Sequence, residues 1–285
     1  MTGILDYLPE VIADNIMCDT KDLNEIRVRR DKPVTYYTDN KEYKVLFEGK
    51  DVNADVGMIQ NIYNRICRYS KYAYESYIRN GFITIEGGHR VGICGRAVIK
   101  NNEVYTIDNI SSLNIRVCHE IVGVASEISD KIIKNNKLKN TLIISPPGYG
   151  KTTLLRDLIR IISNAGFNVS VIDERSEIAG MYNGKTSCNL GPRTDVMDAM
   201  PKHYGMNMVL RTMKPDVIAV DEIGTQNDFE ALLNIRKSGV NIIATAHGEG
   251  KDSIEGNNMI SRMLENDLFS NLFFIDSNRK VYECM

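Results

Sequence analysis

The segment SPPGYGKTT, residues 145–153, constrains the fold more than any other part of the chain. It begins with the last residue of the apolar run TLIIS, and a helix-length stretch, 151–164, starts inside it. A glycine-rich loop that joins a strand to a helix and ends in Gly-Lys-Thr is typical of a P-loop, in which backbone N–H groups surround phosphate oxygens. The segment therefore predicts an α/β domain with a phosphate site where a strand ends.

The residue types of this loop fit that chemistry. Gly148 and Gly150 let the backbone curl closely around a phosphate, and the amino end of the helix adds partial positive charge. Lys151 can reach the β- and γ-phosphate oxygens, and the Thr152 hydroxyl is a ligand for Mg²⁺. Ser145 stands where the common pattern has its first Gly. The expected nucleotide-binding residues are Pro147, Gly148, Tyr149, Gly150, Lys151, Thr152 and Thr153.

Short apolar runs alternate with helix-length segments through the second half of the chain. Runs of this kind are typical of strands buried on both faces, and their alternation with helices favours a mainly parallel sheet covered on both sides. We expect an α/β ATPase domain over residues 136–285, with strands at 141–145, 169–173, 217–221, 241–246 and 272–276 and helices at 151–164, 206–213, 227–238 and 254–266.

The first half predicts a mixed α/β domain over residues 1–135, bounded by the polar stretch 134–140. Residues 23–29 and 43–47 alternate apolar and polar side chains, as half-buried strands do. Gly-rich and Asn-Asn turns divide 81–107 into two or three strands, and ISSLNIRVCHE predicts one more. One long helix is predicted over 56–79, because its apolar residues share one face: Ile59, Ile62, Ile66, Tyr69, Ala73 and Tyr77.

Two further strand ends carry acidic residues. The apolar run of VIAVDEIG ends in Asp221 and Glu222, and the carboxyl ends of parallel strands meet at one edge of a sheet, so both should face the P-loop. Asp221 would hold Mg²⁺ through water, and Glu222 could orient and polarise the attacking water. The run VSVID leads into DERSE, where Glu174 or Glu177 competes with Glu222 for this role; the alternative is salt bridging to Arg175.

Other polar residues complete the list of candidates. Thr245 and His247 follow another apolar run, where a polar side chain could sense the γ-phosphate; the alternative for His247 is a purely structural role. An arginine can stabilise the charge that develops on the γ-phosphate, although each arginine could equally form a surface ion pair. The arginine candidates are Arg193 and Arg211 in the second half and Arg90, Arg96 and Arg116 in the first.

Composition narrows the function classes. Lys and Arg number 35 and Asp and Glu 37, a net charge of −2, which argues against strong attraction of the whole chain to nucleic acid or anionic lipid. No apolar run has the length of a membrane span, and the first residues lack the pattern of a secretory signal, so we expect a cytosolic protein. The six cysteines form no CxxC pair and are expected to be free thiols. Basic and aromatic residues over 63–81 are interpreted as a packed helix face rather than a nucleic-acid surface.

The motifs resemble those of the ATPases of type II and type IV secretion and of pilus assembly. DERSE, DEIG and ATAHG follow the P-loop in the order of that group's acidic box, second acidic strand end and histidine box, although Asp221 stands where that group more often has Gly. The chain is also similar, from about residue 70 to residue 248, to the stage III sporulation protein AA family of endospore-forming bacteria. GGHRVG, DERSEIAG and RTDVMDAMPK are among the segments that carry this similarity.

This resemblance implies a RecA-like P-loop NTPase core with a smaller mixed α/β N-terminal domain, using ATP and Mg²⁺. It also implies a hexameric ring in the mother-cell cytoplasm, held at the membrane by a small membrane protein of a channel between mother cell and forespore. By analogy, Arg96 or Arg116 would contact a nucleotide on the neighbouring subunit. Two alternatives stay open: a nucleotide-gated scaffold with little turnover, and a nucleic-acid-dependent motor.

Overall fold

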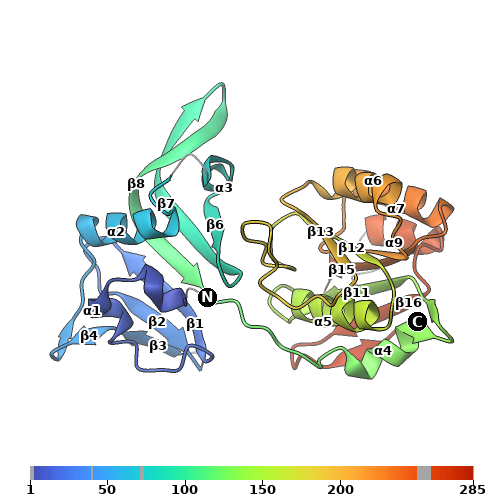
Figure 1. Cartoon of the computed structure of the whole chain (residues 1–285), viewed down its shortest axis with the longest axis horizontal. Helices are drawn as coiled ribbons and strands as arrows, with labels where there is room; N and C mark the ends of the chain where they lie inside the picture. Colours follow the sequence, from blue (N-terminus) through green and yellow to red (C-terminus); the bar gives the residue numbers. More distant parts are fainter. Residues whose placement is uncertain (1–2, 40, 71–73, 249–257, 285) are drawn as a thin grey trace. The chain divides into compact units, whose positions relative to one another are not determined.

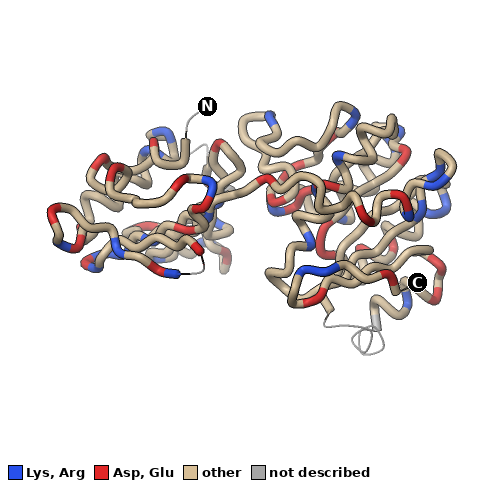
Figure 2. Tube along the Cα trace, turned by 90° about the horizontal axis from the view of Figure 1, so that it is seen from below, with Lys and Arg blue, Asp and Glu red and all other residues tan. Residues whose placement is uncertain are grey.

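The computed structural model describes residues 3–39, 41–70, 74–248 and 258–284. The chain divides into two units (Figure 1). Unit 1 comprises Met1–His119 together with Gly180–Ser187, and unit 2 comprises Glu120–Ala179 and Cys188–Met285. Acidic and basic residues are interspersed along the trace of each unit (Figure 2). Among the described residues, no helix combines the length and apolarity needed to cross a bilayer.

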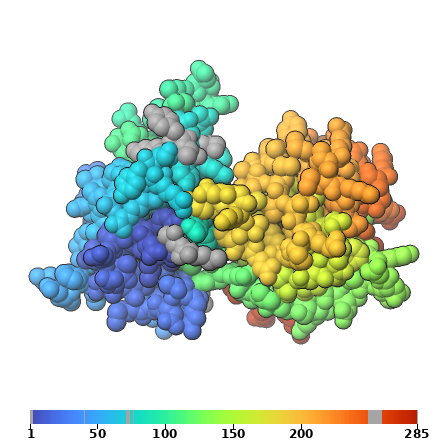
Figure 3. All heavy atoms as spheres, viewed as in Figure 1, coloured from blue at the N-terminus to red at the C-terminus, as the bar shows by residue number. Residues whose placement is uncertain are grey.

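Unit 1 contains a six-stranded antiparallel sheet in the order β3-β2-β1-β8-β7-β6. The strands β7 and β8 stay paired with each other beyond the residues that pair with β6 and β1. This two-stranded extension projects from the rest of unit 1 (Figure 3). Short helices η1 (Ile4–Tyr7) and α1 (Glu10–Ala13) precede the sheet. The strands are β1 (Leu23–Arg29), β2 (Thr35–Thr38), β3 (Lys41–Lys44), β6 (Phe82–Ile85), β7 (His89–Lys100) and β8 (Glu103–Arg116).

The helix α2 (Val56–Ile66) covers part of this sheet with its apolar side. Ile59, Ile62 and Ile66 are at most 1% exposed, as their helical spacing predicts. The prediction of one helix through residue 79 is wrong, because Arg68 and Tyr69 have φ values of 46° and 58°, and a right-handed helix cannot continue through left-handed residues. A second helix, α3, covers Glu75–Arg79, while residue 73 lies outside the described residues.

Two strand predictions in unit 1 also need correction. Residues 43–47 do not form one half-buried strand: β3 is exposed along its length, Val45 is buried, and β4 (Leu46–Phe47) pairs separately with β5 (Lys50–Asp51). ISSLNIR is not a separate strand, because β8 runs through it without a break. The Asn-Asn turn between β7 and β8 is confirmed: both residues are left-handed, as a two-residue hairpin turn requires.

Residues Gly180–Ser187 form a small hairpin that belongs to unit 1. Tyr182 and Lys185 exchange N–H···O bonds of 2.8 and 2.9 Å across the left-handed pair Asn183–Gly184. The Tyr182 hydroxyl lies 3.1 Å from that of Tyr74. At the base of the hairpin, Gly180 lies so close to Gly88 that a Cβ on Gly180 would sit 2.7 Å from the Gly88 Cα. The GGHRVG and DERSEIAG segments therefore meet at a contact that excludes side chains.

Replacing Gly180 by alanine should therefore destabilise the protein more than the same change at Gly184. Both glycines have positive φ, but no atom lies within 4 Å of a Cβ placed on Gly184. We expect a loss of about 1 kcal/mol for Gly184→Ala from backbone strain, and about 2–4 kcal/mol for Gly180→Ala, where the clash with Gly88 adds to the strain. Urea unfolding followed by circular dichroism measures both losses; equal losses would contradict the close contact.

Unit 2 contains a seven-stranded sheet in the order β13-β12-β14-β15-β11-β16-β17, parallel except for β17. Helices cover both faces of this sheet (Figure 1). The strands are β11 (Thr141–Ser145), β12 (Val169–Asp173), β13 (Thr194–Asp198), β14 (Val217–Val220), β15 (Asn241–His247), β16 (Asn271–Ile275) and β17 (Val281–Glu283). The helices are α4 (Ser126–Ile132), α5 (Lys151–Asn164), α6 (Lys202–Thr212), α7 (Gln226–Lys237) and α9 (Asn258–Glu265).

The change of unit falls between His119 and Glu120, earlier than the predicted boundary after residue 135. The reason is that Ala125, Ile128 and Ile132 pack into the core of unit 2 together with residues of α5. The polar stretch 134–140 is not a boundary. It overlaps a short hairpin of β9 (Ile133–Lys134) and β10 (Lys137–Leu138) within unit 2.

Candidate functional site: a P-loop with acidic strand ends

The parallel sheet of unit 2 brings four polar segments to one edge. Strands β11, β12, β14 and β15 are neighbours in register, so their carboxyl ends lie together. The P-loop follows β11, the acidic segment 173–177 follows β12, and Asp221 follows β14. His247 ends β15 and is the register partner of Ser145. Ligands of open parallel sheets bind beyond this edge of the strands.

The P-loop has the conformation that its glycines predict. Gly148 and Gly150 have φ values of 81° and 96°, and α5 begins immediately after Gly150. No side chain caps this helix, so its first N–H groups are available at the loop. Ser145, which replaces the usual first glycine, is completely buried at the end of β11, and its hydroxyl donates to the Pro146 carbonyl at 2.9 Å.

Lys151 is held at the mouth of the loop. The residue is 5% exposed, and its Nζ lies 3.1 Å from Nδ1 of His247 and 3.4 Å from the Ser145 carbonyl oxygen. Burial lowers the pKa of this lysine, while the carboxylates of Asp221 and Glu222 act in the opposite direction. The ammonium group is therefore poorly solvated and well placed to receive an anion.

Thr152 and Asp221 are directly linked across the site. The Thr152 hydroxyl donates to Oδ2 of Asp221 at 2.7 Å, and the Thr245 hydroxyl donates to Oδ1 of the same carboxylate. Hydroxyl and carboxylate oxygens are the ligands that Mg²⁺ prefers, and Mg²⁺ keeps several waters. Among the described residues, no group of three or more His, Cys, Asp or Glu side chains has the arrangement of a metal cage. The oxygens of Thr152 and Asp221 thus fit a cation that is held partly by phosphate and water.

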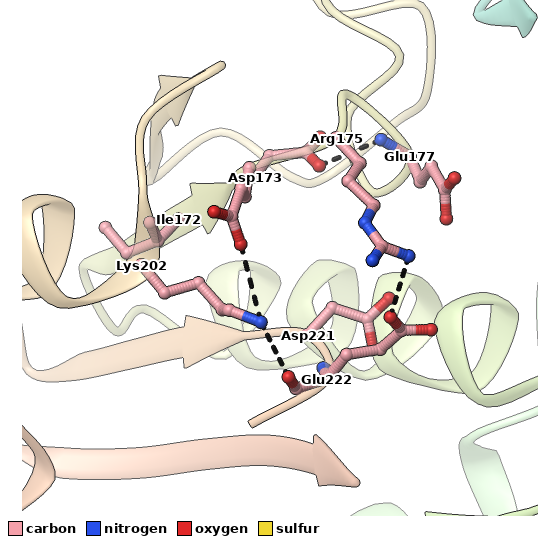
Figure 4. A pocket seen from close by; sticks show the side chains of 8 residues that line it. Ile172, Asp173, Arg175, Glu177, Lys202, Asp221 and Glu222 are labelled. Carbon is pink, nitrogen blue, oxygen red and sulfur yellow. Dashed lines mark hydrogen bonds and ion pairs between the residues drawn. The ribbon is translucent and has the colours of Figure 1, made fainter. Parts of the chain in front are cut away.

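Glu222 is held by both its main chain and its side chain. Its φ is 52°, its N–H donates to the Thr245 hydroxyl at 2.9 Å, and its carbonyl accepts from Nζ of Lys202 at 2.6 Å. Its carboxylate lies 2.9 Å from Nη1 of Arg175 (Figure 4) and 3.0 Å from Nε2 of His247.

His247 connects Lys151 with Glu222. A lysine ammonium only donates hydrogen bonds, so Nδ1 of His247 accepts from it, and the ring hydrogen therefore sits on Nε2. Nε2 can then donate to the Glu222 carboxylate. The neutral imidazole thus forms one hydrogen-bonded chain from the P-loop lysine to the acid at the end of β14.

The acids after β12 have other partners. Asp173 is 2% exposed and accepts hydrogen bonds from the N–H groups of Glu177, Ile178 and Ala179 at 2.8, 3.0 and 2.8 Å. These bonds shape the turn after β12. Burial raises the pKa of Asp173 to about 7, while the N–H groups of Ala179 and Ile178 act in the opposite direction. The Glu174 carboxylate lies 3.4 Å from Nζ of Lys202. The carboxylate of Glu177 stands apart from Asp221 and Glu222 (Figure 4).

The two arginine candidates of unit 2 lie away from this edge. Arg193 precedes β13, and its carbonyl accepts from the N–H of Val169 at the amino end of β12, on the opposite edge of the sheet. Arg211 is in the last turn of α6, about 14 Å along the helix axis from Lys202. Arg90, Arg96 and Arg116 belong to unit 1, where they lie on β7 and β8.

Sequence reasoning missed Lys202. It lines a small pocket together with the acids after β12 and β14 (Figure 4). The signal was present, because Lys202 directly follows Pro201 in RTDVMDAMPK, one of the segments that carry the family resemblance. The strand β13 within that segment was also missed, because its sequence TDVMD is too polar to stand out as a buried strand.

A phosphate-binding loop between strand and helix, with acids at the neighbouring strand ends of a parallel sheet, defines the P-loop NTPase class. The fold resembles that of the pilus retraction motor PilT, whose crystal structure contains bound ADP, with a TM-score of 0.66 and 15% identity over 99% of this chain and 82% of that one. It also resembles the Legionella pneumophila ATPase DotB, with a TM-score of 0.58 and 14% identity over 93% of this chain and 76% of that one. The predicted fold class, a P-loop ATPase core with an N-terminal domain, is confirmed, and the sheet of the N-terminal unit is antiparallel.

The chain belongs to the family described as "Sporulation stage III, protein AA", which matches residues 4–284. It is 38% identical over 279 residues to "Stage III sporulation protein AA" of Bacillus subtilis (strain 168), covering 94% of this chain and 89% of that protein. A more distant relative is the "Uncharacterized protein ycf45" of Cyanidium caldarium, which is 29% identical over 163 residues, 55% of this chain and 46% of that protein.

Proposed function

We propose that this protein is a Mg²⁺-dependent ATPase. The observation that carries the proposal is the arrangement of the P-loop side chains. Lys151 is linked through His247 to Glu222, and Thr152 is hydrogen-bonded to Asp221. The two residues with which a P-loop would hold a triphosphate and its metal are thus linked to the two acids expected beyond it, Thr152 directly and Lys151 through His247.

In this proposal each residue has a separate task. The backbone N–H groups of 148–153 and the ammonium group of Lys151 bind the β- and γ-phosphates. Thr152 directly and Asp221 through water would hold Mg²⁺, which would supply positive charge at the phosphate oxygens. Glu222 accepts a hydrogen bond from the attacking water and orients it, with Glu177 as the rival residue. An arginine from a neighbouring subunit would complete the site. By analogy with the secretion ATPases this is Arg96 or Arg116, while Arg193 and Arg211 lie away from the P-loop edge of their own chain.

Membership of the family supports a role for this activity in sporulation. We propose that the protein works as a hexameric ring on the cytoplasmic side of the mother-cell membrane and powers or assembles a channel between mother cell and forespore. A small membrane protein of the same assembly would hold it there. Membership of the sporulation family and the likeness to the fold of a pilus motor support this role.

Phosphate release from ATP by the full chain tests the enzymatic proposal. We expect steady turnover with Mg²⁺, and its loss when EDTA removes the metal. ATP binding without measurable phosphate release would instead support the nucleotide-gated scaffold. Stimulation by single-stranded DNA that disappears at higher salt would support a nucleic-acid motor.

A further inference from the structure

Glu222 has a main-chain conformation that its residue type disfavours. Its φ of 52° lies in the left-handed region, which costs about 1–2 kcal/mol for a residue that has a Cβ. Such a conformation persists only when surrounding contacts hold it. The direction in which the side chain leaves the strand end depends on this conformation. The carboxylate points toward Arg175 (Figure 4) and lies 3.0 Å from Nε2 of His247.

Two groups from other elements hold this main chain. On the amino side, the N–H of Glu222 donates to the hydroxyl of Thr245 on β15. On the carboxyl side, Nζ of Lys202 donates to the Glu222 carbonyl at 2.6 Å. Hydrogen bonds from a charged donor are about twice as strong as neutral ones, and the Lys202 side chain is only 16% exposed, so water competes weakly with it.

The local fold delivers Lys202 to this position. Lys202 is the first residue of α6 and follows Pro201, a residue that suits the start of a helix. One turn later, Gly205 lies against β12: a Cβ on Gly205 would come within 2.7 Å of Cγ2 of Ile172. Glycine at this position therefore lets α6 approach the strand that ends in Asp173, and the Lys202 side chain reaches across that strand end to Glu222 (Figure 4).

We infer that Lys202 is a positioning residue for the acid that activates water. Its ammonium group stabilises the left-handed conformation of Glu222 and so directs the carboxylate toward the P-loop lysine. The Glu174 carboxylate, 3.4 Å from the same Nζ, keeps the lysine side chain in place. This inference rests on the proposed function, because it assigns Lys202 a part in the hydrolysis that Glu222 promotes.

Steady-state hydrolysis by Lys202→Met, Lys202→Gln and Lys202→Arg tests this inference. Loss of the donor should misdirect the carboxylate and lower kcat on the order of 10- to 100-fold in Lys202→Met and Lys202→Gln, with KM for ATP unchanged. Lys202→Arg should recover most of the rate, because its guanidinium can still donate to the carbonyl. The matched control is Lys237→Met, since Lys237 is an exposed lysine at the end of α7.

A second background separates positioning from a general structural effect. In Glu222→Gln there is no carboxylate to direct, so adding Lys202→Met should change kcat less than about twofold. A wild-type rate in both Lys202→Met and Lys202→Gln would overturn the inference. A KM for ATP that rises by the same factor as kcat falls would also overturn it, because that result would indicate that Lys202 contacts the nucleotide. If the wild type itself shows no turnover, the proposed function fails first, which is a distinguishable result.

Discussion

Replacing Lys151 by alanine should abolish most of the ATP turnover and weaken nucleotide binding. Lys151 is the cation of the loop, and it is buried beside loop carbonyls and His247 rather than dispersed in solvent. Its charge is therefore available to a phosphate at little cost in lost hydration. In comparable sites, removing one hydrogen-bond donor that faces the charge developing in the transition state lowers kcat by about 10²–10³-fold. Phosphate release and titration with a fluorescent ADP measure the two effects.

The control for this change is Lys237→Ala, which removes a lysine from the exposed end of α7. It should leave kcat and nucleotide affinity as in the wild type. Spore formation gives a second readout in a sporulating host: Lys151→Ala should reduce it and Lys237→Ala should not. If Lys151→Ala hydrolyses ATP at the wild-type rate, the phosphate site is not at this loop.

Replacing Glu222 by glutamine should separate binding from hydrolysis. Glutamine has nearly the same shape and can still contact Arg175 and His247, but it cannot take a proton from water. We expect kcat to fall by about 10²–10⁴-fold while nucleotide affinity stays within a few fold of the wild type. Single-turnover phosphate release measures the chemical step directly, because it does not depend on product dissociation.

Glu177→Gln is the matched control among the acids, because the carboxylate of Glu177 stands apart from Asp221 and Glu222. This variant should therefore keep most of the hydrolysis rate. Glu174→Gln is no such control, because Glu174 is the ion-pair partner of Lys202. A loss confined to Glu177→Gln, with Glu222→Gln fully active, would transfer the role of water activator to Glu177.

The P-loop half of the fold could be predicted from sequence because its central strands are buried on both faces. TLIIS, VSVID and VIAV are continuous apolar runs, and each is a central parallel strand with helices above and below. Unit 1 was less accessible. Its edge strand β3 carries only exposed side chains, and its first long helix ends at two left-handed residues that the apolar spacing continues across. The spacing of apolar residues predicts neither the exposed edge strand nor the left-handed residues after the helix, because neither feature depends on which residues are apolar.

The residues of the site also fall into two groups, those that the sequence predicts and those that only the structure reveals. Lys151, Thr152, Asp221 and Glu222 stand in short motifs whose spacing along the chain is enough to propose their chemistry. Lys202 does not, because its contact joins the start of α6 to the end of β14 through a helix packed on a third strand. The link from Lys151 to Glu222 through His247 likewise depends on strand order in the sheet.

By itself, the sequence determined the phosphate loop, the acids beyond it and the parallel sheet that carries them, because a short run of consecutive residues is enough to predict each of these. Only the tertiary structure decided which acid meets the P-loop lysine and what holds that acid in a left-handed conformation. It also decided that a hairpin from the middle of the P-loop half belongs to unit 1. The physical reason is that such contacts join residues far apart in the chain, whose encounter depends on how whole elements pack.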